Sequence, residues 1–313
     1  MIVVFGSVNV DLVARVSRIP RPGETVLAPT HERHHGGKGA NQAIAAARAA
    51  DGAIPVVMAG AVGDDPLGEA ARANLAANGV DPSPLETHDA PTGVAFIAVD
   101  DEGENAITVA SGANALARPD GLGPLLADAE VLVLQMEVPL AAVAAAARMG
   151  AEAGVRVVLN LAPVPIDPHM PTLDALLAAT DVLVLNGHEA DALCALVGLP
   201  DRDGPSRDAA LAARCAADVV VTLGAAGARA ATRGGESLLV PALPVDPVDT
   251  TGAGDAFVGA LAAGLAEDLP LADALARAAV AGALACLAFG AQAASPTRAA
   301  IEAALRTRTG EPS

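Results

Sequence analysis

The chain alternates between two patterns of hydrophobic and polar positions. Short, mostly aliphatic runs rich in β-branched residues are separated by Ala-rich segments of helical length. The short runs predict strands at 2–5, 56–59, 131–134, 155–159, 182–185 and 219–222. The Ala-rich segments predict helices at 39–50, 67–78, 140–152, 172–179, 188–196 and 207–216. This order is typical of an α/β fold in which a doubly wound, mainly parallel sheet has helices on both faces, and ligands bind beyond the carboxyl ends of its strands.

Two stretches lack helical periodicity. Residues 11–35 place Pro20 and Pro22 in a turn between extended segments, and residues 93–109 are two strand-like runs joined by an acidic turn that contains glycine, which predicts a hairpin. We expect them to form a small β-sheet lid over the strand ends, although an ordinary edge extension of the sheet is the alternative. From about residue 254 the pattern is helical almost to the end. The three segments that share the α/β pattern would form the core: 1–10, 36–92 and 110–313.

Composition and charge exclude several classes of protein. Hydrophobic residues make up 52% of the 313 residues, which excludes intrinsic disorder. A net charge of −18 argues against a nucleic acid partner and against an anionic membrane surface. No apolar run is long enough for a membrane span. The three cysteines are far apart, and no basic signal region begins the chain, so we expect reduced thiols and a cytoplasmic location.

The first candidate site is the glycine-rich loop 36–42, GGKGANQ, at the start of a predicted helix. Its glycines allow a ligand to approach the backbone closely, and a helix N-terminus offers free N–H donors. The spacing differs from that of a P-loop. The loop could donate Lys38 and Asn41 to sugar hydroxyls, or it could be a simple helix entry. Because Lys38 is the one lysine of the chain, its position here favours a functional loop.

The second candidate is DTTGAGD at 249–255. The small residues Gly252, Ala253 and Gly254 precede a predicted helix and can direct several backbone N–H groups at one point. Such an anion hole suits a phosphoryl group in transfer, and Asp255 could accept the proton of an attacking hydroxyl. The alternative is a glycine turn in which Asp255 is an acid favoured by the helix dipole. The spacing does not fit a dinucleotide-binding fingerprint.

Further polar residues follow predicted strands. Asn186 and Glu189 share a face of a starting helix and could hold a hydrated Mg²⁺, form a capping box, or do both. Asn9 and Asp11 alternate onto one side of an extended segment and could bind vicinal hydroxyls, or they could be solvated turn residues. Glu137 follows the predicted strand 131–134 and Gln135, a polar residue where the sheet should be most buried, and both a functional and a structural role are open.

Taken together, the motifs resemble those of the ribokinase-like (phosphofructokinase-B type) sugar kinases over about residues 2–297. The motifs that carry this resemblance, in order, are GSVNVDL, GGKGANQA, GDDPLGE, GENAI, the Asn186/Glu189 pair, TLGAAG and DTTGAGDAF. The resemblance implies a doubly wound α/β domain with a β lid that also builds a homodimer interface. It also implies the phosphorylation of D-ribose by ATP to give ribose 5-phosphate and ADP.

The resemblance also implies individual roles. Asp255 would be the base, and the amides of Gly252, Ala253 and Gly254 would form the anion hole. The sugar would contact Asn9, Asp11, Gly37, Lys38, Gly39, Asn41, Glu137 and Asp255. ATP would contact Asn186, Thr222, Gly224, Gly227 and Gly254. Glu189 would bind Mg²⁺ through water. K⁺, as a monovalent activator, would be held by Asp249, Thr251, Ala285, Ala288 and Gly290.

Two single positions and one short segment depart from the family pattern. The segment 186–189, NGHE, keeps the ends of the pattern, Asn186 and Glu189, but changes its middle, a change that we expect to be tolerated. Ala294 stands where a serine often helps to bind the cation, so that Ser295 or a carbonyl would have to replace it, and Ala279 stands where a larger polar residue often touches the nucleotide. The alternatives are a sibling kinase acting on 2-deoxyribose, fructose, a sugar acid or a nucleoside, and a sugar sensor without catalysis. Phe96 is the one aromatic residue of the hairpin, which disfavours a nucleoside, and the intact Asp255 motif disfavours a sensor.

Overall fold

The structure, a computed structural model, describes residues 1–200 and 202–309. Its larger sheet has ten strands: β1 (Ile2–Phe5), β4 (Val56–Gly63), β5 (Val80–Asp81), β6 (Leu85–His88), β9 (Val131–Leu134), β10 (Arg156–Asn160), β11 (Val182–Asn186), β12 (Asp218–Thr222), β13 (Ala228–Ala231) and β14 (Ser237–Val240). Their order is β14-β13-β12-β11-β10-β9-β1-β4-β5, and β6 pairs with β4. The strands are parallel except for β13 and β14, which extend one edge in antiparallel pairs. The predicted doubly wound, mainly parallel sheet is confirmed.

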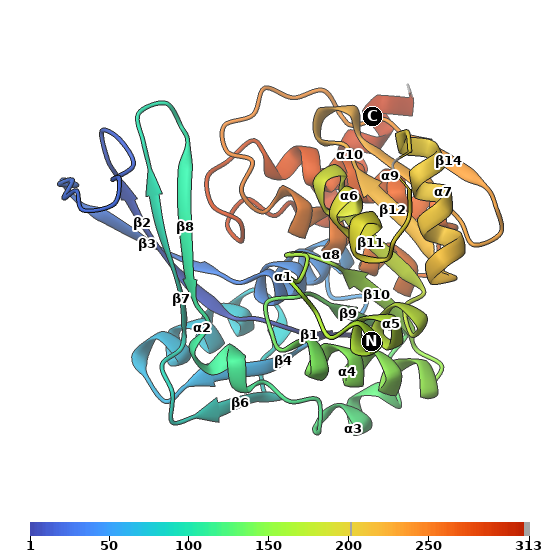
Figure 1. Cartoon of the computed structure of the whole chain (residues 1–313), viewed down its shortest axis with the longest axis horizontal. Helices are drawn as coiled ribbons and strands as arrows, with labels where there is room; N and C mark the ends of the chain where they lie inside the picture. Colours follow the sequence, from blue (N-terminus) through green and yellow to red (C-terminus); the bar gives the residue numbers. More distant parts are fainter. Residues whose placement is uncertain (201, 310–313) are drawn as a thin grey trace.

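Helices cover both faces of this sheet (Figure 1). One layer holds α1 (Lys38–Ala50), α2 (Pro66–Ala77), α8 (Ala253–Ala266), α9 (Leu271–Ala285) and α10 (Arg298–Thr309). The other holds α3 (Leu122–Leu126), α4 (Leu140–Glu152), α5 (Met170–Ala178), α6 (Gly187–Leu196) and α7 (Gly204–Cys215). Two short 3₁₀ helices are η1 (Gly112–Leu116) and η2 (Gly224–Ala226). Strand side chains alternate between two separate hydrophobic cores, as with Ile2 and Val4 on one face and Val3 and Phe5 on the other.

Small residues bring α1 and α8 close together. A side chain at Gly259 would lie 2.5 Å from the Cβ of Ala45 and 2.6 Å from the backbone nitrogen of Ala46. The glycine therefore allows the two helix backbones to approach. This contact matters for function because α1 and α8 each begin with one of the candidate motifs.

A second sheet of four strands projects from one side of the molecule (Figure 1). It consists of β2 (Asn9–Arg15), β3 (His31–Gly36), β7 (Gly93–Val99) and β8 (Asn105–Ala110), in the order β3-β2-β7-β8. The predicted hairpin is confirmed, since β7 and β8 pair antiparallel. The stretches 11–35 and 93–109, which are far apart in the sequence, form one sheet because β2 pairs in parallel with β7. We name this sheet the lid.

The predicted strands and helices are all present, with boundaries that differ by a few residues. The edge strands β13 and β14 and the short strands β5 and β6 were not predicted, because they are two to four residues long and lack a strong apolar run. Within residues 1–200 and 202–309, no helix is both long and apolar enough to cross a membrane.

Candidate active site

A buried carboxylate lies at the start of α8. Asp255 is 7% exposed, and each of its two side-chain oxygens accepts a hydrogen bond from an amide of α1. The Nδ2 of Asn41 donates to Oδ2, and the Nε2 of Gln42 donates to Oδ1, both at 2.9 Å. Because both donors come from consecutive residues of one helix, the close packing of α1 against α8 determines the position of the carboxylate.

The turn before Asp255 is open toward the strand ends. Gly252 has φ 78°, and a side chain there would lie 2.5 Å from the Cβ of Ala291, so the position requires glycine. Among the described residues no side chain caps α8, and the N–H of Ala253 makes only a long bond, 3.3 Å, to the Thr250 carbonyl. A helix start without a cap offers N–H donors and a positive dipole end to an anion, as the predicted anion hole requires.

The candidate sugar-binding residues meet at the carboxyl ends of β1 and β9. The Oε2 of Glu137 accepts hydrogen bonds from the Ser7 hydroxyl (2.6 Å) and from the backbone N–H of Lys38 (3.0 Å). Asn9 is buried, and its Oδ1 accepts from the Nδ2 of Asn114 at 2.7 Å. These bonds join the first loop, the glycine-rich loop and the end of β9 into one wall.

Glycines of this wall leave room for the backbone and for Asp11. A side chain at Gly36 would lie 2.3 Å from a carboxylate oxygen of Asp11, and one at Gly37 would lie 2.7 Å from the Asn9 nitrogen. At Gly39 it would lie 2.7 Å from the Ser7 nitrogen. The loop therefore packs directly against the strand that carries Asn9 and Asp11.

The charges of the site act on one another. Burial and the nearby Glu137 raise the pKa of Asp11 to about 6. The carboxylates of Asp255 and Glu137 raise the pKa of Lys38, which therefore stays charged in spite of its burial. Burial also raises the pKa of Glu189. Lys38 thus places one positive charge among four carboxylates that come from different elements.

Asp11 should destabilise the free protein at neutral pH. Its pKa rises from 3.8 to about 6 on folding, so the stabilising contribution of its protonated form is complete below pH 3.8 and is lost as the pH rises through 6. We expect Asp11→Asn to raise the free energy of unfolding by about 1–2 kcal/mol at pH 7 and to change it little at pH 4. Thermal unfolding at both pH values measures this, and an equal gain at both would contradict it.

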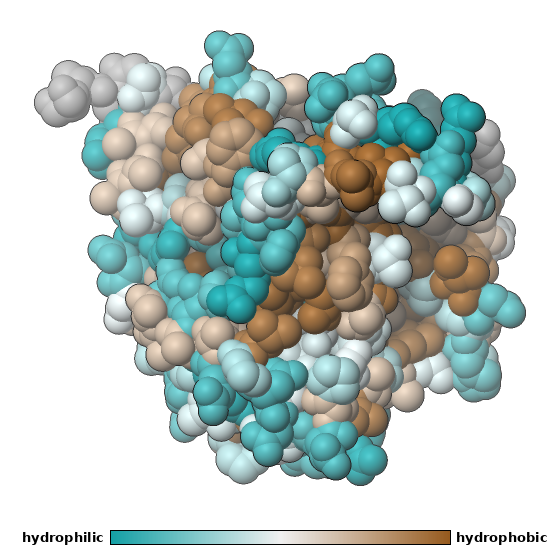
Figure 2. All heavy atoms as spheres, turned by 90° about the vertical axis from the view of Figure 1, so that its left-hand side faces the viewer, coloured by the Kyte–Doolittle hydropathy of each residue, from teal (hydrophilic) through white to brown (hydrophobic). Residues whose placement is uncertain are grey.

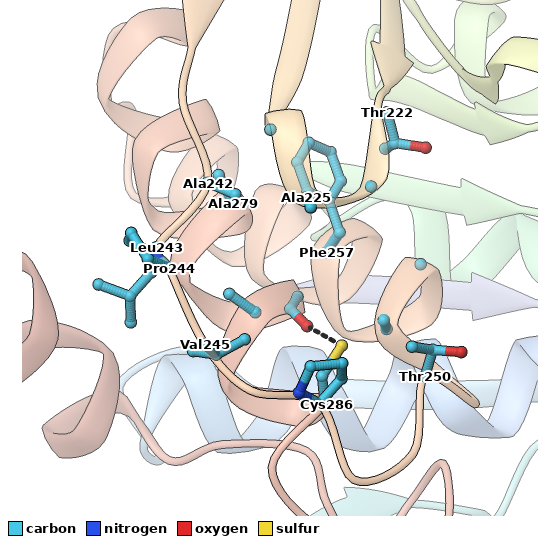
Figure 3. Close-up of a pocket in the computed structure, with 17 residues that line it drawn as sticks. Thr222, Ala225, Ala242, Leu243, Pro244, Val245, Thr250, Phe257, Ala279 and Cys286 are labelled. Carbon is cyan, nitrogen blue, oxygen red and sulfur yellow. Dashed lines mark hydrogen bonds between the residues drawn. The ribbon is translucent and has the colours of Figure 1, made fainter.

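An apolar cavity of about 260 Å³ lies beside the start of α8, where Ala253 and Gly254 line it (Figure 3). The predicted ATP-binding residues Thr222, Gly224, Gly227 and Gly254 all line it, whereas Asn186 does not. Most of the remaining lining residues come from the segment after β14 and from α8 and α9: Ala242, Leu243, Pro244, Val245, Pro247, Thr250, Ala253, Phe257, Ala279, Gly282, Ala283 and Cys286. Ala279, which departs from the family pattern, also lines this cavity. The cavity can hold a flat apolar group such as a nucleotide base.

Asn186 and Glu189 form the predicted capping box at the start of α6. The Asn186 side chain accepts from the Glu189 N–H at 2.8 Å, and the Glu189 side chain accepts from the Asn186 N–H at 2.7 Å. The structural alternative for this pair is therefore confirmed. The charges of Lys38 and Asp255 both influence the pKa of Glu189, so its carboxylate is near the other charged groups of the site.

The loop after α9 packs against the segment before α8. The carboxylate of Asp249 accepts hydrogen bonds from the N–H groups of Thr251 (2.9 Å) and Gly290 (3.0 Å), and these bonds lower its pKa. An ionised carboxylate can serve as one oxygen ligand of a monovalent cation. The hydroxyl of Ser295 donates to the Ala291 carbonyl at 3.2 Å, and Ala294 adds no oxygen of its own side chain.

The sequence did not predict that amide side chains support Asp255: Asn41 was predicted as a sugar contact, and Gln42 was given no role. Gln42 contacts it directly, while Gln135, Asn160 and Gln292 surround the two donors. The available signal was the presence of long polar side chains inside segments that are otherwise apolar.

Comparisons with known proteins agree with this geometry. Residues 1–298 match the profile described as "pfkB family carbohydrate kinase". The chain is 38% identical to a ribokinase of Bacillus subtilis over 311 residues, which cover 96% of this chain and 98% of that protein. It is 37% identical to a deoxyribokinase of Salmonella typhi over 83% of this chain and 84% of that protein. The structure of Arabidopsis thaliana ribokinase complexed with ribose and ATP superimposes with a TM-score of 0.86 at 30% identity, covering 97% of this chain and 98% of that one.

Proposed function

Because the chain belongs to the pfkB family of carbohydrate kinases, we propose that it transfers the γ-phosphoryl group of ATP to the 5-hydroxyl of D-ribose, giving D-ribose 5-phosphate and ADP. The observation that carries this proposal is the position of Asp255. Its carboxylate lies at an uncapped helix start whose residues Ala253 and Gly254 line the apolar cavity, and its charge acts on Lys38 of the wall.

The sugar occupies the wall side of this site. Asn9, Asp11, Asn41 and Glu137 offer carboxylate and amide groups to its hydroxyls, and Lys38 offers an ammonium donor; Gly37 and Gly39 allow the ring to approach the backbone. Asp255 accepts the 5-hydroxyl proton as that oxygen attacks the γ-phosphorus and the bond to the bridging oxygen of ADP breaks. Since phosphoryl transfer depends mainly on positioning, a carboxylate that is held by two amides suffices as the base.

The nucleotide occupies the cavity side. The base lies among the residues that line the cavity, including Thr222, Gly224 and Gly227. The γ-phosphate then reaches the N–H groups of residues 252–254, where the helix dipole and Lys38 stabilise the charge that develops in the transition state. Asn186 does not line the cavity, so we expect it to contact the phosphates rather than the base.

ATP is used with Mg²⁺, which neutralises phosphate charge. Glu189 suits this ion because a carboxylate is a hard oxygen ligand and Mg²⁺ keeps several of its waters. For K⁺, the fit rests on Asp249, whose ionised side chain is beside the Gly290 backbone. Carbonyls of Thr251, Ala285, Ala288 and Gly290 complete this proposed set.

The homodimer that we propose forms through the exposed apolar face of the lid. Its outer face carries Phe96, which is 52% exposed and is aligned in the sheet with Leu12 and Thr108. A shallow apolar hollow surrounds it, lined by Leu12, Ala14, Ile19, Pro20, His31, Phe96, Ile97, Ala98, Ala106 and Thr108. Figure 2 shows the side of the molecule that carries the lid, where hydrophobic areas lie among hydrophilic ones. A second copy of the lid would cover this face.

A coupled assay of ADP release tests the proposed reaction. We expect the highest kcat/KM with D-ribose among D-ribose, 2-deoxyribose, fructose and adenosine, and faster turnover in K⁺ than in Na⁺. The deoxyribokinase relative makes 2-deoxyribose the most informative competitor. A higher kcat/KM for any other substrate would overturn the assignment of ribose. Equal rates in both salts would overturn the K⁺ site alone.

A further inference from the structure

The chain contains three glutamines, Gln42, Gln135 and Gln292, and all three are buried around Asp255. Gln42 and Gln135 are 0% exposed and Gln292 is 6% exposed. Glutamine is mostly found on protein surfaces. The burial of every glutamine of the chain at one carboxylate therefore indicates a shared role.

Gln42 uses both N–H donors of its side-chain amide and also its oxygen. Its Nε2 donates to Asp255 Oδ1 at 2.9 Å and to Asn160 Oδ1 at 3.0 Å, and its Oε1 accepts from Gln135 Nε2 at 2.7 Å. An amide has two N–H donors, so both are used. No donor of Gln42 remains free to leave Asp255 for another partner.

The neighbours of Gln42 determine which way its amide points. Asn160 uses its own Nδ2 to donate to the Val184 carbonyl of the adjacent strand at 3.3 Å, so its oxygen faces Gln42. Gln135 directs its Nε2 at the oxygen of Gln42. An inverted Gln42 amide would place oxygen against oxygen and nitrogen against nitrogen, which is costly in a buried site.

The second oxygen of Asp255 is supported by a parallel series of bonds. Asn41 donates to it, and the Oδ1 of Asn41 accepts from the Nε2 of Gln292 at 2.9 Å. The Oε1 of Gln292 accepts from Asn74 at 2.6 Å. Both oxygens of Asp255 are thus held by amides whose own orientation is determined by further amides.

We propose that Gln42 is a positioning residue for the base of the reaction: it holds the Asp255 carboxylate in the orientation that faces the acceptor hydroxyl, and it is itself oriented by Gln135 and Asn160. This inference rests on the proposed function. A carboxylate whose two oxygens are held by fixed donors needs little reorganisation to accept the proton.

Gln42→Met tests the role in catalysis, because it keeps the length of the side chain and removes its hydrogen bonds. We expect kcat to fall about 10- to 100-fold and the KM for the sugar to stay within about threefold. An unchanged kcat, or a loss that appears as a raised KM rather than a lowered kcat, would overturn the proposal.

Thr180→Val is the matched control. It also removes a buried hydrogen bond, from the Thr180 hydroxyl to the Leu176 carbonyl (2.8 Å), but just before β11, at the amino end of that strand and away from the carboxyl ends where the site lies. We expect a lower Tm with an unchanged kcat. The wild-type chain is assayed in parallel. If the wild-type chain turned over none of the tested sugars, the proposed function would be rejected. If the wild-type chain were active and Gln42→Met were equally active, this inference alone would be rejected.

A measurement on the folded wild-type chain covers the case in which Gln42→Met does not fold. Labelling of glutamine with ¹⁵N gives three side-chain NH₂ groups, one for each glutamine. We expect slow exchange with water for the Gln42 group, and a larger change of its chemical shift in Asp255→Asn than for Gln135. Fast exchange, or signals of Gln42 that do not respond to Asp255→Asn, would overturn the proposal.

Discussion

Asp255→Asn should leave only a small residual turnover while sugar binding remains. Asparagine has nearly the same shape as aspartate, but it cannot accept a proton at neutral pH. Its amide also places an NH₂ group against one of the two N–H donors, Asn41 or Gln42, that now bond to the carboxylate. Loss of the base lowers kcat by about 10²- to 10⁴-fold. The coupled ADP-release assay measures this loss, and calorimetric titration with the sugar measures the binding that remains.

The control for this change is a variant with normal chemistry and reduced stability. Thr180→Val serves here too, since Thr180 lies just before β11, at the amino end of that strand and away from the site. If Asp255→Asn turned over as fast as Thr180→Val, Asp255 would not be the base, and the anion hole and Lys38 would have to account for catalysis without proton transfer to a side chain.

Gly252→Ala should impair both catalysis and stability. The residue has φ 78°, a conformation that alanine adopts at a cost, and an added Cβ would lie 2.5 Å from the Cβ and 2.6 Å from the Cα of Ala291. Relief of this contact has to move the start of α8 or the segment at 291, and the N–H groups of 252–254 move with it. We expect kcat to fall about 10²- to 10³-fold, as for a disrupted oxyanion hole, and stability to fall by about 2 kcal/mol.

Gly123→Ala is the matched change at a position without these constraints. Gly123 lies in α3, and no atom is within 4 Å of an added Cβ there. We expect it to leave kcat unchanged and Tm equal or slightly higher, because alanine favours a helix. Steady-state kinetics measure kcat, and thermal unfolding measures Tm, for both variants. A Gly252→Ala variant as active as Gly123→Ala would rule out the backbone at 252–254 as the anion hole.

Much of the fold was predictable because its signals are local. The runs IVVF and VLVL are apolar at every position, as expected of strands covered on both faces, and the Ala-rich segments between them are long enough for helices. The hairpin was predictable from its turn. The pairing of β2 with β7 was not, because about 80 residues separate the two strands and no local pattern records which strands become neighbours.

The residues of the candidate site also fall into those with a local sequence signature and those that depend on distant partners. Glycine loops at the starts of α1 and α8 have a local signature, so Lys38, Asn41 and Asp255 could be proposed from the chain alone. The pairing of Asn186 with Glu189 was also local, and the capping box is present. Gln42 and Gln135 gave only a weak signal, because a buried amide is recognised by its partners, and those partners lie more than 90 residues away.

The sequence by itself therefore determined the class of fold, the order of its elements and the motifs that carry the chemistry, because each depends on residues that are neighbours along the chain. Only the tertiary structure decided how Asp255 is held, since its donors reach it across 213 and 214 residues through the packing of α1 on α8. It likewise decided that every glutamine of the chain is buried around one carboxylate. Hydrogen bonds between distant segments depend on distance and direction in space, which local sequence patterns do not record.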